Sequence, residues 1–303
     1  MTFEIRQVET FKGLELILRD QCNHFKMSED ATKARLEHFK NELQRDDVVS
    51  FIALNEEALP VGFMLCYIRD EHVEVMWLYA SEFDKTDAVL LELIQYGNRA
   101  VKELNKKFFQ IFFIMNLGIR EKLEELGFLI CPRVRMSYST KENSIPSYSL
   151  HNDYQLGKFT WEKLDEILTV ITAANLDSID GKIFSQFTEL NKLKQFFFSD
   201  PDIKEKLNLQ SPIVLKDGKI VGINIIKDLS DTATYIWDLA VLPEHRGKGL
   251  GKYLMLKSHE IGHQQGFEEI ILDVTVENTI AYNIYKKLGY KITLHYLSAI
   301  INY

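Results

Sequence analysis

The chain has 303 residues, of which 46% are hydrophobic and 26% are charged, a composition typical of a globular protein with room for two ordinary domains. Its formal net charge of −8 and the lack of a basic stripe argue against nucleic acid as the main partner. The cysteines, Cys22, Cys66 and Cys131, are widely spaced without a metal-ligand pattern, as in a reducing compartment. We find no signal peptide and no apolar run long enough for a bilayer, so we expect a cytoplasmic protein without a membrane partner.

The first half of the chain alternates short apolar runs with amphipathic ones. Period-2 runs predict strands, and runs with a 3.6-residue period predict helices. Strands are predicted at residues 3–5, 48–54, 61–68, 73–79, 108–115 and 129–138, and helices at 12–20, 30–45, 87–104 and 118–126. A polar stretch around Pro146 then interrupts the pattern and is typical of a linker. We therefore divide the chain into a first domain (1–140), a linker (141–153) and a second domain (154–303).

The second half repeats the order of the first. It predicts strands at 154–156, 213–215, 221–222, 234–242 and 269–276, with helices from 161 and over 250–265. Trp237-x-x-Ala240 corresponds to Trp77-x-x-Ala80 at an offset of 237 − 77 = 160. Leu288 corresponds to Leu126 at an offset of 288 − 126 = 162. A nearly constant offset predicts one mixed α/β fold used twice.

Glycines alternate with basic residues at the predicted start of the helix over 250–265. The first turn of a helix has backbone N–H groups without partners and carries the positive end of the macrodipole. Glycines let a bulky anion approach that backbone, and basic side chains add full charges. The pattern predicts a turn that binds phosphate or pyrophosphate through Arg246, Gly247, Lys248, Gly249, Gly251 and Lys252.

Two other phosphate-binding motifs do not fit this turn. A P-loop ending at Gly251-Lys252 needs a glycine where Arg246 stands and a Ser or Thr where Tyr253 stands. A dinucleotide-binding fingerprint begun at Gly247 meets Lys252 where its third glycine belongs. Both motifs are therefore excluded.

Two sequence blocks instead resemble the GCN5-related N-acetyltransferase (GNAT) superfamily. Residues 239–251 read Leu-Ala-Val-Leu-Pro-Glu-His-Arg-Gly-Lys-Gly-Leu-Gly, similar to the acyl-CoA motif of that family. The second block stands as Asn278, Ala281, Tyr285, Gly289 and Tyr290. The resemblance covers about residues 154–303 and is fainter in the first half. It implies two tandem GNAT folds, each a mixed, mostly antiparallel twisted sheet flanked by helices.

The resemblance also implies a cofactor and residue roles. Acetyl-CoA, or another acyl-CoA, would be the co-substrate, its pyrophosphate on the turn and its pantetheine on the backbone of Leu239 and Val241. Asn278 would contact the pantetheine, and Tyr285 would be the general acid. A phenol (pKa about 10) can give its proton to the leaving thiolate (thiol pKa about 8.5). No metal is needed.

The general base stays open between two aspartates. A thioester is attacked by a neutral amine, so a carboxylate near the acceptor would help. Asp238 lies on the strand before the turn, and strand alternation places it opposite Tyr235 and Trp237. Asp273 lies on the next strand. Residues 176–194 and the aromatic cluster 196–198 occupy the place where family members build the acceptor side of the cleft.

His259 and His263 match the H-E-x-x-H zinc motif. Measured from Leu254, the centre of the apolar helix face, they fall at about 140° and about 180°. We therefore expect both histidines in solvent and no metal site.

The first domain has lost the features of the phosphate-binding turn. An offset of 160 carries Arg246, Gly249 and Gly251 onto Thr86, Val89 and Leu91, next to the carboxylates of Asp84 and Asp87. An offset of 162 carries Asn278 and Tyr285 onto Asn116 and Leu123. We expect this domain to be a scaffold without acyl-CoA.

The expected function is transfer of an acetyl or other acyl group from acyl-CoA to an amine of a small molecule, by direct attack. Holding both substrates in one cleft makes the attack effectively intramolecular. Two alternatives are an acyl-CoA-binding sensor without catalysis and an acetyltransferase of peptide or protein N-termini. The oligomeric state and the acceptor are left open.

Overall fold

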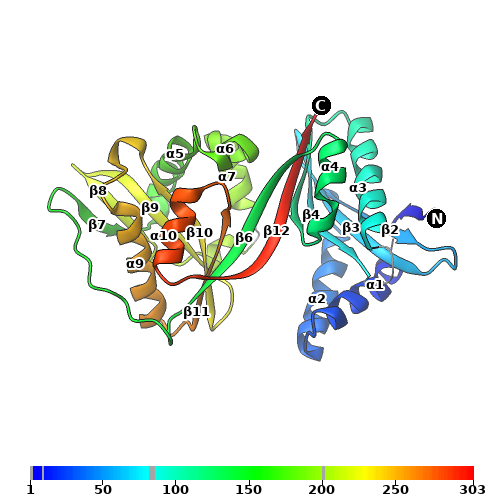
Figure 1. Ribbon diagram of the computed structural model, residues 1–303, viewed down its shortest axis with the longest axis horizontal. Helices are drawn as coiled ribbons and strands as arrows, with labels where there is room; N and C mark the ends of the chain where they lie inside the picture. The colour runs from blue at the N-terminus through cyan, green and yellow to red at the C-terminus, as the bar shows by residue number, and fades with distance from the viewer. Residues whose placement is uncertain (1–2, 9, 82–85, 200–201) are drawn as a thin grey trace. The chain divides into compact units, whose positions relative to one another are not determined.

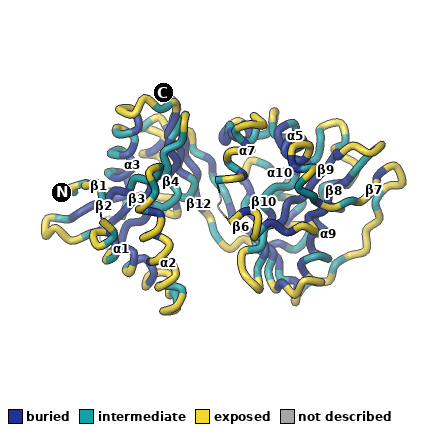
Figure 2. Tube along the Cα trace, turned by 180° about the vertical axis from the view of Figure 1, so that it is seen from behind, coloured by how far each residue is buried: buried dark blue, intermediate teal, exposed yellow. Residues whose placement is uncertain are grey.

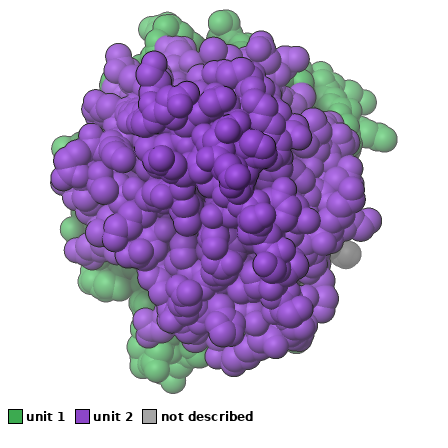
Figure 3. Space-filling view, turned by 90° about the vertical axis from the view of Figure 1, so that its left-hand side faces the viewer, with its two compact units in different colours: residues 1–131, 296–303 green, residues 132–295 purple. Residues whose placement is uncertain are grey.

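The computed structural model describes residues 3–8, 10–81, 86–199 and 202–303. The chain forms two compact units, coloured separately in Figure 3. Unit 1 contains residues 1–131 together with 296–303, and unit 2 contains residues 132–295. In both units the strands are largely buried and the outer surfaces of the helices are exposed (Figure 2).

Unit 1 is a mixed sheet with helices on both faces (Figure 1). Its strands stand in the order β1-β2-β3-β4-β5-β12, and only the β4–β5 pair is parallel among the pairs described. The elements are β1 (Glu4–Gln7), α1 (Phe11–His24), α2 (Glu29–Glu42), β2 (Val48–Leu54), β3 (Pro60–Ile68), β4 (His72–Ala80), α3 (Thr86–Glu103), β5 (Phe108–Ile114), η1 (Leu117–Ile119), α4 (Arg120–Glu125) and the end of β12 (Lys291–Asn302).

Strand alternation divides the core of unit 1 into two layers. Met64 on β3 packs in the cluster under α3, and its neighbour Phe63 packs in the cluster under α1 and α2. Both side chains are fully buried. At roughly 1.5–3 kcal/mol for each large apolar side chain, such burial makes the sheet the centre of the unit.

Unit 2 repeats this architecture with strands in the order β6-β11-β10-β9-β8-β7, and here β10 and β11 are the parallel pair. Its elements are β6 (Leu129–Ser139), β7 (Gln155–Lys158), η2 (Trp161–Lys163), α5 (Leu164–Asn175), α6 (Ile179–Ile183), η3 (Ser185–Thr188), α7 (Leu190–Phe198), α8 (Ile203–Lys206), β8 (Pro212–Lys216), β9 (Lys219–Asp228), β10 (Ala233–Val241), η4 (Pro243–His245), α9 (Leu250–Gln264), β11 (Glu269–Thr275) and α10 (Thr279–Lys287).

The two faces of the unit 2 sheet carry different helices. Ile223 and Ile225 on β9 pack in the cluster of α5 and α7. Asn224, between them, points to α9 and donates a hydrogen bond to the Ser258 hydroxyl oxygen (2.7 Å). The mixed α/β fold used twice, predicted from the sequence, is confirmed. Among the described residues, every helix is too short or too polar to cross a membrane.

The compact units differ from the predicted ranges 1–140 and 154–303. Residues 133–139 of β6 pair with β11 in unit 2, although they follow the helices of the first half. Residues 297–302 of β12 pair with β5 in unit 1, although they end the second half. The two halves of the chain have therefore exchanged their closing strands. The predicted linker, 141–153, lies within unit 2.

Candidate active site

The predicted phosphate-binding turn lies between β10 and α9. Gly247 (φ 75°) and Gly249 (φ 78°) adopt the left-handed conformation that glycine takes without strain. No group of the described residues accepts a hydrogen bond from the backbone N–H of residues 247–252. Six successive free donors at the N-terminus of a 15-residue helix make a strong anion-binding surface.

The basic side chains of this turn contact the protein itself. Arg246 donates hydrogen bonds to the carbonyl oxygens of Val241 (3.1 Å) and Ala174 (2.7 Å), which holds the end of β10 against the end of α5. Lys248 donates to the carbonyl oxygen of Glu244 (3.0 Å). These two residues therefore hold the shape of the turn in addition to bringing positive charge.

Tyr148, from the predicted linker, lies against the turn. A Cβ atom on Gly249 would stand 2.1 Å from the Tyr148 hydroxyl oxygen. The ammonium of Lys252 lies 5.1 Å from the centre of the Tyr148 ring, within cation–π range. A Cβ on Gly247 or Gly251 would meet no atom within 4 Å, so the rest of the turn is open.

A gap opens between β10 and β11 beside the turn. Their parallel pairing runs from Ala233 with Glu269 to Ile236 with Leu272, and no pairing between described residues follows. Leu239 and Val241, the expected pantetheine partners, lie on this length of β10, which pairs with β9 but not with β11 among the described residues. An extended amide chain could therefore pair with the free strand edge.

A β-bulge changes the direction of Asp238. Tyr235 is opposite Lys227 on β9 and Asp238 is opposite Ile225, with Trp237 as the extra residue. Lys227 and Ile225 lie on the same face of β9, so Asp238 and Tyr235 share a face. The prediction that Asp238 lies opposite Tyr235 and Trp237 is therefore wrong, because it assumed unbroken alternation.

The two candidate bases have different surroundings. Asp273 accepts two hydrogen bonds from Arg135 (2.9 and 2.8 Å) and one from the Tyr235 hydroxyl (3.0 Å). Oδ1 of Asp238 is covered from solvent and has no partner among the described residues. Burial and, secondarily, the charge of Asp180 raise the pKa of Asp238 to about 7. Asp238 is the one of the two with a free oxygen.

Asp180 joins α6 to the end of β11, to the start of α10 and to β6. It accepts hydrogen bonds from the hydroxyl of Thr275, from Nδ2 of Asn278 (3.2 Å) and from Arg133 (3.4 Å). No sequence motif singled out Asp180. The only signal was its position within the predicted acceptor segment, 176–194.

Tyr285 and Asn278 lie at either end of the short helix α10. Tyr285 is buried, and burial followed by the charges of Asp238 and Asp180 raises the pKa of its phenol, which therefore stays protonated. Asn278 accepts a hydrogen bond from the backbone N–H of Ala281 (3.2 Å) while its Nδ2 donates to Asp180. Its side chain is thus engaged within the protein at both ends.

The expectation that both histidines of the H-E-x-x-H pattern face solvent is wrong for His259. His263 is exposed, but His259 is 1% exposed and stacks on Tyr138 with ring centroids 3.9 Å apart. Its Nε2 lies 3.1 Å from the Tyr290 hydroxyl oxygen, and burial lowers its pKa to about 4. Helix α9 is covered on a second face, by β6 and the segment after α10. Among the described residues, no group of three or more His, Cys, Asp or Glu side chains could hold a metal ion.

The corresponding region of unit 1 lacks the turn. Val89 and Leu91 of α3 are buried in the core, and so is Leu123, which the offset of 162 aligns with Tyr285. Asp87 accepts a hydrogen bond from Asn116 at the start of α3. Asp84 lies outside the described residues.

The fold and the turn before α9 are similar to those of the GNAT family. Residues 181–290 match the model of the acetyltransferase (GNAT) family. A β-lysine N(6)-acetyltransferase of Methanococcus maripaludis is 24% identical over 223 residues, which cover 66% of this chain and 79% of that protein. A putative [ribosomal protein bS18]-alanine N-acetyltransferase of Bacillus subtilis is 34% identical over 77 residues, or 25% of this chain and 50% of that protein.

Solved structures share the tandem arrangement. A tandem GNAT protein from the clavulanic acid biosynthesis pathway has a TM-score of 0.65 at 12% identity, covering 99% of this chain and 98% of its own. A GCN5-related N-acetyltransferase from Sphaerobacter thermophilus has a TM-score of 0.69 at 14% identity, covering 99% and 95%. At such identities the likeness shows the fold alone. Together with the family match over residues 181–290, it shows a tandem GNAT fold whose second half carries the match to the acetyltransferase (GNAT) family.

Proposed function

We propose that unit 2 transfers an acetyl group from acetyl-CoA to an amine of a small-molecule acceptor by direct attack. The observation that carries the proposal is the row of unpaired backbone N–H groups at residues 247–252 beside the open edge of β10. A pyrophosphate would satisfy the donors of the turn, and the pantetheine amides would pair with β10 near Leu239 and Val241. The thioester would then lie in the gap, near Asp238 and Tyr285.

The reaction needs one base and one acid. The acceptor nitrogen forms a bond to the thioester carbonyl carbon, the carbon–sulfur bond breaks, and the amide and CoA thiol leave. Asp238 takes the proton of the amine, and Tyr285 gives its proton to the sulfur. The raised pKa of Tyr285 keeps the proton available but makes the phenol a weaker acid, so transfer must accompany cleavage of the carbon–sulfur bond.

The charges around the gap favour an amine that is cationic before it reacts. Asp180 and Asp238 are both acidic, and Arg133 donates a hydrogen bond to Asp180. The β-lysine N(6)-acetyltransferase, which is named for a small amino acid as acceptor, matches over 79% of its length. These points support a small diamine or amino acid as acceptor.

A second candidate is an acetyltransferase of protein N-termini. The bS18-alanine N-acetyltransferase of Bacillus subtilis and N-alpha-acetyltransferase 30 of Schizosaccharomyces pombe are named for such acceptors. Their matches cover 25% and 26% of this chain, so they support this acceptor less than the longer match supports a small molecule.

The experiment is a thiol-release screen with acetyl-CoA against β-lysine, lysine, polyamines, aminoglycosides and short peptides with free N-termini. We expect turnover with small diamines at rates at least tenfold above those with peptides. Faster turnover of peptides would select the second candidate. Thiol release that no amine increases would contradict both.

A further inference from the structure

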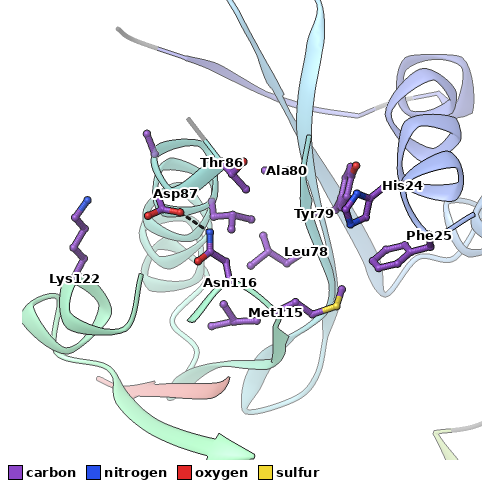
Figure 4. A pocket seen from close by; sticks show the side chains of 13 residues that line it. His24, Phe25, Leu78, Tyr79, Ala80, Thr86, Asp87, Met115, Asn116 and Lys122 are labelled. Atoms are coloured by element: carbon purple, nitrogen blue, oxygen red, sulfur yellow. Dashed lines mark hydrogen bonds between the residues drawn. The ribbon is translucent and has the colours of Figure 1, made fainter. Parts of the chain in front are cut away.

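Unit 1 contains a cavity of about 750 Å³, within the size range of small-molecule sites. Figure 4 shows Asp87 and Asn116 on one side of it, Tyr79, His24 and Phe25 on the other, and Leu78 and Met115 between them. Every residue that lines it belongs to unit 1. The cavity is therefore separate from the proposed active site.

The cavity exists because β4 and β5 stop pairing before they end. Their parallel register runs from His72 with Phe108 to Val75 with Ile111, and Leu78 and Ile114 line the cavity beyond that point. Leu78, Leu90 and Ile114 give it an apolar floor, and each is at least nine-tenths buried in the protein. Unit 1 thus has a gap between its two parallel strands, as unit 2 does. In unit 1 this gap is a pocket with an apolar floor.

The charge at the mouth of this cavity excludes a phosphate. Asp87 stands in the first turn of α3, where unit 2 has free N–H groups flanked by lysines. Its carboxylate is held by the side-chain amide of Asn116, a neutral partner, and no ion pair joins it to a cation among the described residues. Lys122 also lines the cavity but is exposed at its edge. The carboxylate repels an anionic ligand, and its negative charge favours a cationic one.

The opposite wall is aromatic. The ring of His24 lies 4.8 Å from that of Phe25 and 6.1 Å from that of Tyr79, measured between centroids. Tyr79 is fixed by donating a hydrogen bond to Asp20 (2.8 Å). Aromatic faces and a carboxylate across an apolar floor are the groups that recognise an organic ammonium ion.

We propose that this cavity binds a small organic amine, with its ammonium group on Asp87 and its carbon skeleton between the apolar floor and the aromatic wall. The site is distinct from that of the acetyl transfer and does not depend on it. A ligand with an aryl or alkyl body and one cationic nitrogen fits both walls.

The test is a calorimetric titration of the full chain with N,N-dimethylphenethylamine, which cannot form a neutral amide product. Phenethylamine and 2-phenylethanol serve as the primary amine and the neutral isostere. We expect both amines to bind about 10- to 100-fold more tightly than the alcohol, the value of one charge-assisted hydrogen bond. Asp87→Asn should weaken the amines by the same factor and leave the alcohol unchanged.

The matched control is Glu103→Gln, which removes one negative charge from the other end of the same helix, outside the cavity. It should leave amine binding unchanged, and both variants should retain wild-type acetyl transfer because neither residue belongs to unit 2. Equal affinity for amines and alcohol, or an unchanged titration of a folded Asp87→Asn protein, would overturn the proposal. Failure of acetyl transfer in the wild type would affect only the proposed function.

Discussion

Asp238 should set the pH dependence of the reaction. Its active form is the carboxylate, and its pKa is raised to about 7, so the reactive fraction grows as the pH rises through that value. We expect kcat/KM to rise through about pH 7 and then level off. Asp238→Asn should remove this limb and lower kcat/KM about 10²–10⁴-fold, as measured in a pH–rate profile.

Asp180 offers an independent control of that assignment. Its negative charge contributes to the raised pKa of Asp238, so Asp180→Asn should move the limb of the profile to lower pH. A limb that stays in place, or moves upward, would mean that a group other than Asp238 titrates.

Tyr285 should affect chemistry and not cofactor binding. Tyr285→Phe removes the phenol that would protonate the leaving thiolate and keeps the buried ring. We expect kcat to fall about 10²–10⁴-fold while the Kd for acetyl-CoA, measured by calorimetry, stays the same. Equal single-turnover rates in the two proteins would assign the proton to water or to another residue.

At the scale of elements, the turn before α9 should tolerate no side chain at Gly249. An alanine there would be strained by about 1–3 kcal/mol, and its Cβ would meet the Tyr148 hydroxyl. We expect Gly249→Ala to weaken CoA binding on the order of tenfold or more, measured by calorimetry.

Gly218 is the matched control for this change. It has the same φ, 78°, in the turn between β8 and β9, and a Cβ there would meet no atom within 4 Å. Gly218→Ala should cost similar stability and leave CoA affinity unchanged. Equal CoA affinity in the two folded variants would remove the turn from the cofactor site.

The burial of His259 predicts a loss of stability in acid. Its folded pKa is about 4 against an ordinary value of 6.5, so the unfolded chain binds the proton more readily. The stabilisation is present above pH 6.5 and is lost as the pH falls from about 6.5 to about 4. His259→Phe should flatten this part of the curve of unfolding free energy against pH, and His263→Gln should not.

Sequence patterns predicted where the helices and strands lie better than they predicted what those elements pair with or pack against. The strand over 48–54 was predicted at its observed bounds, because a short apolar run is a local property of the sequence. The bulge at Trp237 depends on how β9 pairs with β10, which no local pattern states. His259 was misplaced because the helical angles were measured from Leu254 alone, whereas α9 also packs against Tyr138.

At the scale of the whole molecule, we expect one CoA per chain. Unit 1 has Thr86, Val89 and Leu91 in place of the turn's anchor and glycines, and the carboxylate of Asp87 near the expected pyrophosphate position. Calorimetric titration of the full chain should give a stoichiometry of one. A second equivalent site would show that unit 1 also binds acyl-CoA.

The sequence predicted two copies of one fold but not the exchange of their closing strands. The segments 129–138 and 291–302 are both apolar enough to pair with either β5 or β11. Residue pattern specifies that a strand pairs, while the partner is chosen by how the chain connects in space. The boundaries of the two compact units therefore could not be predicted from the sequence and were found only in the structure.

The exchange of closing strands also determines when each unit can finish folding during synthesis. Unit 1 contains residues 1–131, but Leu297 and Ala299 of its core are translated only after residues 132–295 of unit 2. At about 5–20 residues per second, the nascent first half waits on the order of ten seconds for them. During that wait the edge of β5, with Phe109 and Ile111, has no partner from its own unit. The half of the chain that is made first is the last to be completed, and a chaperone has most to protect there.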